Sequence, residues 1–330
     1  MSTRPVTICR AARSSGGPSS STSRTLKYRK LGDTGVDVSL LSCGTGGPSQ
    51  FGQKTGLDDA GRAALVARAL ELGVNLFDTA EAYGEAEAML GRALRGHPRD
   101  SYLIATKWTS RVGGEPLTDP EAPVRALEQS LERLETDYVD IFQVHGVLPH
   151  HYDRMAEIFI PVMQRLQEQG KTRFLGVTEM LTLDAHHEGM SVAMERHPDV
   201  WDSAMLKYGI MNQWAAKNAL PLAASSSTGM LNMAPVRLTL TRPEKLRERM
   251  GEWGEDDGDS ALDWLSDGDP AELIRRGYQF AAEPAAVTTV ISGTSSIAHL
   301  EANVAAIDGA LPDESLARLK AAYGDSDSPD

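Results

Sequence analysis

The stretch NLFDTAEAYG, residues 75–84, shows how one buried strand of this chain ends, and the interpretation of the fold starts from it. Leu76 and Phe77 run directly into Asp78, and Tyr83 follows five residues after Asp78. One interpretation is ordinary: Asp78 caps the segment after the strand, and Tyr83 is a half-buried aromatic. The other is chemical, because an acid near a phenol is typical of a proton-transfer site. These ten residues fit both interpretations, so the rest of the chain has to decide.

Strand-like and helix-like segments alternate from Leu26 onward. The strand-like runs are continuously apolar rather than alternating, which predicts a parallel sheet that is covered on both faces. The helix-like runs carry apolar residues three and four apart and end near a glycine. The predicted strands are 36–44, 74–80, 102–107, 138–145, 172–178 and 201–209. The predicted helices are 57–73, 85–96, 123–135, 159–170 and 183–197.

The pattern is weaker after Gly209, but it continues to the end of the chain. We expect NALPLAASS to be a seventh strand, SSSTGMLNMAPVRLTL a loop, TRPEKLRERM a helix and GEWGEDDGDS an acidic insertion around 254–260. A helix at 271–282, a last strand at 288–293 and a last helix at 297–307 follow. About eight β-α units at roughly 30-residue intervals predict an α/β fold, a (β/α)8 TIM barrel. We expect this barrel to form one domain over 26–330.

An open doubly wound sheet is the alternative fold. Such a sheet would be favoured by G-x-G-x-x-G between the first strand and a helix. The glycines of GTGGPSQFG are clustered instead, and no helix-like pattern begins there.

The composition argues against several classes of partner. The chain has 33 Lys plus Arg and 46 Asp plus Glu, a formal charge of −13, so it would repel nucleic acid and anionic lipid. No apolar run approaches the roughly 18 residues that a membrane-spanning helix needs. Cys9 and Cys43 are predicted to remain unpaired, which fits a reducing compartment, and we expect a cytoplasmic protein.

Residues 1–25 have a different composition, with four arginines, many serines and no acidic residue. Two interpretations fit: a disordered tail, or a segment that targets the chain to an organelle. Gly16, Gly17 and Pro18 interrupt any amphipathic helix and favour the tail. Under either interpretation the segment lies outside the folded domain.

Polar residues end three consecutive predicted strands. Asp78 ends the second strand, Lys107 the third and His145 the fourth. Because the carboxyl ends of the strands meet at one rim of a barrel, we expect the three side chains to lie together, with Tyr83 within reach. Each residue alone has an ordinary explanation as a cap, a solvated charge or a core histidine. Their conjunction predicts a catalytic site, in which Asp78 supplies the counter-charge that Lys107 needs.

The predicted chemistry is proton transfer to a carbonyl oxygen. A phenol has an unperturbed pKa of about 10, and Lys107 is expected to lower the pKa of Tyr83. Asp78 would keep the lysine charged and fixed, while His145 would orient the carbonyl by a hydrogen bond. Together these groups would contribute roughly 10²–10⁴ in rate. Because the hydride has to come from elsewhere, a nicotinamide cofactor is implied.

From Leu26 to the last helix the chain resembles the aldo-keto reductases. The resemblance is carried by LKYRKLGDTGVDVSLLSCGTG, GVNLFDTAEAYG, LIATK, LERLETDYVDIFQVH, EQGKTRFLGVT and VISGTSSIAHLEANV. It implies a (β/α)8 barrel, NAD(P)(H) as cofactor without a metal, and reversible reduction of aldehydes or ketones. It also implies that Tyr83 is the general acid/base, that Lys107 and Asp78 tune it, and that His145 orients the carbonyl.

The residues that the resemblance assigns to the cofactor match less well. A Ser-Asn pair that commonly holds the nicotinamide carboxamide is Thr178–Glu179 here, and Glu179 has no amide donor. The family glutamine on the sixth strand falls near Met205. Tyr208 either stacks on the nicotinamide or is a barrel-wall aromatic, and Trp108 is expected to line the mouth of the pocket. Gly44 and Thr45, at the end of the first strand, are further predicted cofactor contacts.

The start of the last helix is the predicted site of the cofactor's adenosine end. Gly293 and Thr294 offer backbone and hydroxyl groups to a phosphate at a helix N-terminus. His299 replaces an arginine that often binds the adenosine 2′-phosphate, a nearby glutamate becomes Ala302, and Asn303 is kept. Loss of the guanidinium weakens the argument for strict NADP preference. We therefore expect NADP(H), with NAD(H) as the alternative.

Three further hypotheses stay open. The sequences MLKYGIMNQ and IFIPVMQRLQEQGKTRFLG resemble the branch that contains sugar-lactol dehydrogenases such as galactose dehydrogenase, which would imply a sugar substrate and NAD. The altered Thr178–Glu179 pair and the acidic insertion would fit a regulatory subunit that binds cofactor without turnover. Lys207, near the end of the sixth strand, would fit a Schiff-base aldolase or an anionic substrate contact. The sequence does not indicate the oligomeric state.

Overall fold

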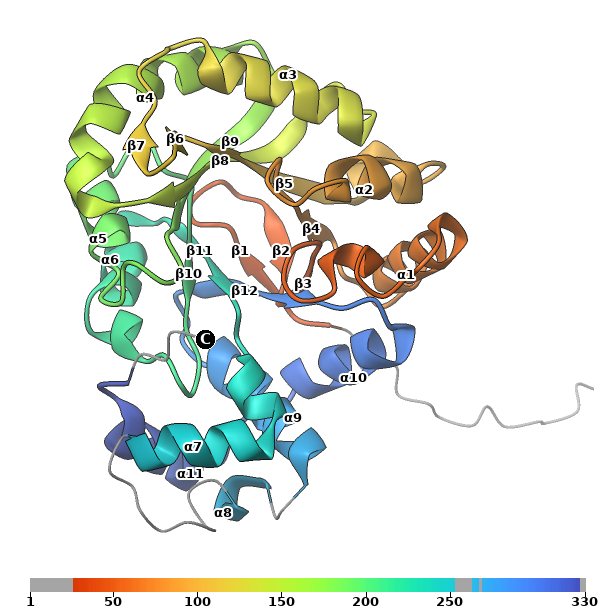
Figure 1. Ribbon diagram of the computed structural model, residues 1–330, viewed down its shortest axis with the longest axis vertical. Helices are drawn as coiled ribbons and strands as arrows, with labels where there is room; N and C mark the ends of the chain where they lie inside the picture. The colour runs from red at the N-terminus through yellow and green to blue at the C-terminus, as the bar shows by residue number, and fades with distance from the viewer. Residues whose placement is uncertain (1–25, 253–262, 267–268, 327–330) are drawn as a thin grey trace, which may run out of the picture.

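Eight parallel strands close into a barrel at the centre of the protein (Figure 1). The computed structural model describes residues 26–252, 263–266 and 269–326. The order around the barrel is β10-β11-β12-β3-β4-β5-β8-β9, so each strand except at the closure lies beside its predecessor in the chain. The strands are β3 (Leu41–Gly44), β4 (Leu76–Asp78), β5 (Leu103–Thr109), β8 (Val139–Val147), β9 (Thr172–Glu179), β10 (Ser203–Lys207), β11 (Gly229–Met233) and β12 (Val287–Gly293). The predicted (β/α)8 barrel is confirmed.

Helices surround the barrel strands and cover their outer face (Figure 1). Several of them begin at a side-chain cap or a proline; Asp58, for example, accepts a hydrogen bond from Gly61 N at the start of α1. The helices of the β-α units are α1 (Asp59–Glu71), α2 (Ala86–Leu94), α3 (Ala122–Leu134), α4 (Tyr152–Glu168), α5 (Glu188–Arg196), α6 (Ala219–Ser226), α9 (Pro270–Ala282) and α10 (Ile297–Ile307). Short 3-10 helices are η1 (Gln50–Gly52), η2 (Arg99–Ser101), η3 (Pro149–His151), η4 (Trp214–Lys217) and η5 (Leu238–Thr241).

An antiparallel hairpin of β1 (Tyr28–Lys30) and β2 (Asp37–Ser39) precedes the barrel. Leu31 and Val38 belong to the cluster of apolar side chains inside the barrel, so the hairpin closes the end at which the strands begin. Its turn packs tightly: a Cβ on Gly32, whose φ is +50°, would lie 2.0 Å from the carbonyl oxygen of Ser227. The predicted first strand is therefore divided between this hairpin and the barrel.

Several elements lie outside the eight repeats. A second hairpin, β6 (Arg111–Val112) with β7 (Glu115–Pro116), follows β5 at the rim. Helices α7 (Pro243–Glu252), α8 (Asp263–Ser266) and α11 (Asp313–Tyr323) gather near α9 in the lower part of Figure 1. The tail at 1–25 and the acidic insertion at 254–260 fall outside the described residues. Among the described helices, none combines the length and the apolar character needed to cross a membrane.

Two predicted segments have a different structure from the one expected. NALPLAASS, expected to be a strand, contains the whole of helix α6. Asn218 caps its first turn, and Leu220 and Ala223 are buried. Pro221 sits in the first turn, where a missing N–H costs no intrahelical hydrogen bond. The seventh barrel strand is instead β11, inside the segment that was expected to be a loop. Helix α11 was not predicted.

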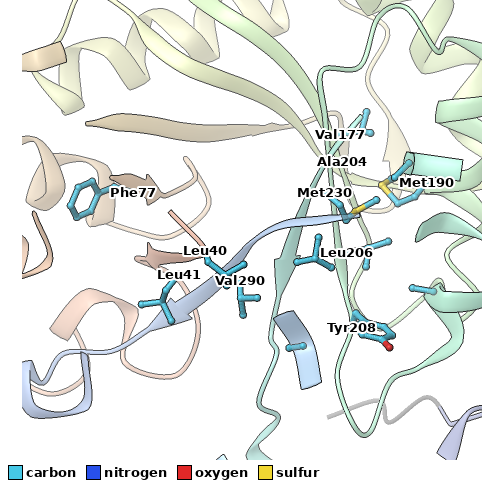
Figure 2. Packing of buried hydrophobic residues seen from close by; sticks show 14 of the residues in the cluster. Leu40, Leu41, Phe77, Val177, Met190, Ala204, Leu206, Tyr208, Met230 and Val290 are labelled. Atoms are coloured by element: carbon cyan, nitrogen blue, oxygen red, sulfur yellow. The ribbon is translucent and has the colours of Figure 1, made fainter. Parts of the chain in front are cut away.

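The core has an inner and an outer layer, because successive side chains of a strand point to opposite faces. The inner layer includes Leu76, Ala105, Ile141, Met205 and Leu231, which fill the barrel. The outer layer packs strands against helices, and Figure 2 shows its members Leu41, Val177, Leu206, Met230 and Val290. This alternation also determines which rim residues face the mouth of the barrel.

Candidate active site

A buried ion pair joins the ends of β4 and β5. Lys107 Nζ donates to both carboxylate oxygens of Asp78, at 2.6 and 2.8 Å, and to the carbonyl oxygen of Thr79 at 2.6 Å. The side chain of Lys107 is 1% exposed. The ammonium thus has its acceptors inside the protein, and the Tyr83 side chain adds a further hydrogen bond, which offsets the cost of removing the charge from water.

Tyr83 and His145 complete a group of four side chains at the rim. The ring centroids of Tyr83 and His145 are 5.8 Å apart with the planes at 82°. Lys107 Nζ lies 5.0 Å from the centroid of the Tyr83 ring. The structure therefore brings together the four residues that the sequence placed at one site: Asp78, Lys107, Tyr83 and His145.

The electrostatics of the lysine and the tyrosine are set by two opposing causes. Burial alone would lower the pKa of Lys107, but the charge and hydrogen bonds of Asp78 outweigh it and the pKa is raised. For Tyr83 burial is also the largest cause, and it raises the pKa more than the charge of Lys107 lowers it. The expected net lowering of the phenol pKa is absent in this state. Lys107 reduces the cost of a phenolate without making it the resting form.

His145 is held as a neutral imidazole. Burial, followed by the charges of Lys107 and Arg111, lowers the pKa of His145 to about 3. A neutral imidazole carries one N–H donor and keeps no positive charge of its own near physiological pH. The group can therefore donate a hydrogen bond to a carbonyl oxygen without competing with Tyr83 for the proton.

Two residues that the sequence did not single out hold Tyr83 in place. Gln53 Nε2 donates to the carbonyl oxygen of Tyr83 at 3.0 Å, and its Oε1 accepts from the N–H of Glu85 at 3.2 Å. Gly46 lies against the ring: a Cβ there would be 2.7 Å from Tyr83 Cε2. The glycine cluster GTGG was the available signal for this close approach, because only glycine leaves room for the ring.

Four of the predicted cofactor residues lie at the same rim. Gly44 pairs with Asp78 on one side and with Gly293 on the other. Thr45 follows directly, donates its N–H to the carbonyl oxygen of Asp78 at 2.8 Å, and has a buried hydroxyl without a partner among the described residues. Thr178 accepts from Gly146 N at 2.9 Å. A buried hydroxyl with a free hydrogen-bonding position fits a polar ligand at this rim.

The remaining cofactor residues of this region lie at the start of α10. Ser296 caps the helix by accepting from the N–H of His299 at 3.3 Å, and the His299 side chain is exposed. Thr294 Oγ1 accepts from the N–H of Ser296 at 3.1 Å. Asn303 donates to Ser292 Oγ at 2.9 Å, at the end of β12. The segment 293–303 contains no Lys or Arg.

Three predicted site residues point to the outer face of the barrel, away from its mouth. Trp108 is 1% exposed and packs edge-on against Phe159 of α4, with ring centroids 4.8 Å apart. Tyr208 is also 1% exposed and stacks on Phe280 of α9.

Glu179 is buried as well; it accepts from the N–H of Lys207 at 2.7 Å and bonds His187 Nδ1. Trp108, Glu179 and Tyr208 each follow a residue that faces the barrel interior, so strand alternation turns them to the outer face. Trp108 and Glu179 therefore do not line the mouth, which corrects the expectation for these two residues. Tyr208 is the barrel-wall aromatic of its two predicted alternatives.

The inward neighbour of Tyr208 is Lys207, which is 1% exposed at the end of β10. It lies two residues beyond Met205 of the inner layer and thus on the same face. Among the described residues, no group of three or more His, Cys, Asp or Glu side chains is arranged to hold a metal ion.

Comparison with known families agrees with this fold. The family model described as "Aldo/keto reductase family" matches residues 42–324. The chain belongs to the aldo/keto reductase family, a family of oxidoreductases.

The L-galactose dehydrogenase of Arabidopsis thaliana is 30% identical over 292 residues, which cover 86% of this chain and 88% of that enzyme. Aldo-keto reductase YhdN of Bacillus subtilis is 33% identical over 162 residues, 46% of this chain and 47% of that protein.

Solved structures give the same result. The putative aldo-keto reductase PA4992 of Pseudomonas aeruginosa is 29% identical with a TM-score of 0.63, covering 85% of this chain and 94% of that one. The holo form of aldo-keto reductase AKR11C1 from Bacillus halodurans has a TM-score of 0.69 over 90% of this chain and 96% of its own. At 24% identity, this structural similarity shows the shared fold alone.

Proposed function

We propose that this protein is an NAD(P)(H)-dependent oxidoreductase that interconverts aldehydes or ketones and alcohols by hydride transfer, with Tyr83 as general acid/base. The observation that carries the proposal is the buried Lys107–Asp78 pair directly beside the phenol of Tyr83 and the neutral imidazole of His145. Asp78 compensates the buried ammonium, so Lys107 can keep its charge beside the phenol without water. Membership of the aldo/keto reductase family supports the same reaction class.

Each residue has a separate role in this mechanism. His145 donates a hydrogen bond to the substrate carbonyl and places its oxygen beside Tyr83. Tyr83 gives its proton to that oxygen during reduction and takes it back during oxidation. Lys107, kept charged by Asp78, stabilises the negative charge that passes through the phenol oxygen. The nicotinamide cofactor, when bound, supplies or accepts the hydride.

The residues that would hold the cofactor share the rim from β3 to α10. They are Gly44, Thr45, Thr178, Gly293, Thr294, His299 and Asn303. NADP(H) remains the favoured cofactor on the family resemblance, with NAD(H) as the alternative, because the start of α10 has a histidine and no guanidinium. Titration with both reduced cofactors, followed by quenching of tryptophan fluorescence, measures the preference directly.

The proposed substrate is a small carbonyl compound or sugar. The similarity to a protein named L-galactose dehydrogenase extends over most of both chains and favours a sugar lactol as the specific case. We further propose that 26–330 acts as one catalytic domain, since its eight strands form a single barrel.

Replacement of Tyr83 by phenylalanine tests the mechanism. Tyr83→Phe removes the transferable proton and keeps the ring, so kcat/KM should fall by about 10²–10⁴ while cofactor affinity changes by less than about two-fold. The assay follows the absorbance of reduced nicotinamide with a panel of aldehydes, ketones and sugars, using NADPH and NADH separately.

The outcomes separate the competing functions. Wild-type protein that binds cofactor but turns over no member of the panel would favour a regulatory subunit. Turnover that survives in Tyr83→Phe would exclude the phenol as the acid. Trapping of a carbonyl substrate by borohydride, lost in Lys207→Met, would instead support a Schiff-base reaction at that lysine.

A further inference from the structure

Arg111 stands at the mouth of the barrel immediately beyond β5. It is the first residue of the β6–β7 hairpin, two residues after Thr109, which pairs with His145 in the sheet. Its Nη2 atom would lie 3.1 Å from a Cβ on Gly146, the residue that follows His145. The same nitrogen is 3.9 Å from Met180 Sδ, just past the end of β9. The guanidinium therefore spans the rim beside the proposed catalytic imidazole.

No carboxylate of the described residues lies within ion-pair distance of Arg111. Its Nε is buried without a hydrogen-bond partner, and the methionine sulfur is a weak acceptor. Other partly buried arginines have strong partners: Arg99 pairs with Asp140 at 2.7 Å, and Arg133 pairs with Glu87 at 2.7 Å. Burial lowers the pKa of Arg111, and no described acid offsets the shift. A guanidinium held in this way has lost hydration without gaining a counter-charge.

Arg111 itself is the uncompensated positive charge at this part of the rim, although the chain as a whole is acidic. Lys107 is neutralised by Asp78, whereas Arg111 is not neutralised by a described residue. Glu115, on the other strand of the hairpin, is exposed. Burial, His150 and Arg111 lower the pKa of His151, and Glu115 raises it by a smaller amount. The neutral imidazole of His145 and the uncompensated guanidinium of Arg111 thus lie side by side at the rim, which favours an anion there.

We propose that Arg111 is the anion-binding subsite of the substrate pocket and that the substrates are aldehydes, ketones or lactols that also carry a carboxylate. Arginine suits this role because its planar fork matches a carboxylate with two parallel hydrogen bonds. His145 and Tyr83 receive the carbonyl end, while Arg111 receives the carboxylate end. The inference rests on the proposed reductase function and adds the class of substrate to it.

The test compares unbranched aldehydes with ω-oxo acids of the same length, such as butanal with 4-oxobutanoate and the pairs one and two carbons longer. Wild-type protein should prefer at least one acid over its aldehyde. Arg111→Met should raise KM for that acid by about 10–100-fold, with kcat little changed and kcat/KM for the aldehyde within about two-fold. Arg111→Lys should restore part of the affinity, since charge returns without the fork.

A matched control removes an arginine elsewhere. Arg154, an exposed residue of α4 paired with Glu157, loses the same charge in Arg154→Met and should leave both kinetic profiles unchanged. Equal activity of wild-type protein on acids and aldehydes, or equal losses on both in Arg111→Met, would overturn the subsite. Failure of the wild type with every carbonyl compound would instead refute the proposed function, so the two ideas fail in different ways.

Discussion

The groups around its ring hold Tyr83 in place. One face approaches Gly46, and the ammonium of Lys107 lies 5.0 Å from the ring centroid. A side chain at position 46 would have to occupy space that the ring already fills. The phenol oxygen can contact both a substrate and Lys107 only if the ring stays in this place. The reaction therefore depends on the position of the ring.

Gly46→Ala should therefore damage the reaction more than the fold. The new Cβ would be 2.7 Å from Cε2 and 2.9 Å from Cζ of Tyr83, so the ring has to move away. A displacement of this kind should lower kcat by about 10–100-fold. Steady-state kinetics measure the loss, and urea unfolding measures the change in stability, which should remain below about 2 kcal/mol.

A double-mutant cycle identifies the cause of that loss. In a Tyr83→Phe background the residual rate no longer depends on the phenol, so Gly46→Ala should have little additional effect. Equal losses in the presence and absence of the hydroxyl would show that Gly46 acts through something other than Tyr83, such as the cofactor.

The same scale shows where prediction from sequence succeeded and where it did not. Asp78, Lys107 and His145 were predictable because each lies at the end of a predicted strand, where the strand meets the rim. The prediction for Trp108 was wrong because it is the next residue along its strand, and alternation turns it outward onto Phe159. The same alternation turns Tyr208 onto Phe280 and decides between its two alternatives in favour of a barrel-wall aromatic.

At the scale of elements, one buried side chain joins two strands and a helix. Asn232 of β11 donates to the carbonyl oxygens of Tyr208, at 2.8 Å, and of Ala281, at 3.1 Å, and it accepts from Tyr208 N at 2.9 Å. Its three hydrogen bonds connect the end of β10 and the last turn of α9 to the barrel wall. They satisfy backbone groups where regular pairing has ended.

Asn232→Ala should lower the free energy of unfolding by about 3 kcal/mol, because it leaves buried backbone groups without partners. Asn75→Ala is a suitable comparison. The Asn75 side chain accepts from Ser39 N at 2.8 Å and donates to the carbonyl oxygen of Asp37 at 2.9 Å, but it is half-buried, so water can replace both bonds and about 1 kcal/mol is expected. Chemical denaturation of both variants checks the order; equal losses would contradict it.

The element boundaries that failed have the same kind of explanation. NALPLAASS was expected to be a strand, but Pro221 lies in the first turn of α6, where a proline is compatible with a helix. GMLNM looked like part of a loop because it is short and begins with glycine. Gly229 is required there, since a Cβ would lie 2.4 Å from Leu31 of the hairpin that closes the barrel. That contact spans nearly 200 positions of sequence and is not visible in local pattern.

At the scale of the whole molecule, the barrel isolates an imidazole from both solvent and acid. His145 has a pKa of about 3 in the folded protein, against about 6.5 in an unfolded chain. Below about pH 6.5 His145 binds a proton in the unfolded chain, whereas in the folded protein it stays unprotonated until the pH approaches 3. This contribution to the free energy of unfolding is therefore complete above that pH and is lost progressively as the pH falls toward 3.

Denaturation at pH 7.5 and at pH 5.0 should reveal this contribution in a comparison of wild type with His145→Gln. The slope is about 1.4 kcal/mol per pH unit for one proton, so the wild type should lose about 2 kcal/mol more than the variant between these conditions. The variant serves as the reference because other groups titrate equally in both proteins. Parallel pH dependences would mean that folded His145 binds its proton normally.

The sequence by itself determined the order of strands and helices up to the sixth strand, the barrel that follows from it, and the polar residue at the end of the second, third and fourth strands. These depend on local periodicity and on the last residue of an apolar run, both of which are properties of neighbours in the chain. Only the tertiary structure decided that Arg111 lies against Gly146, that Gly46 makes room for Tyr83, and that Trp108 faces a helix. Those outcomes depend on barrel closure, which brings together residues whose separation along the chain carries no local signal.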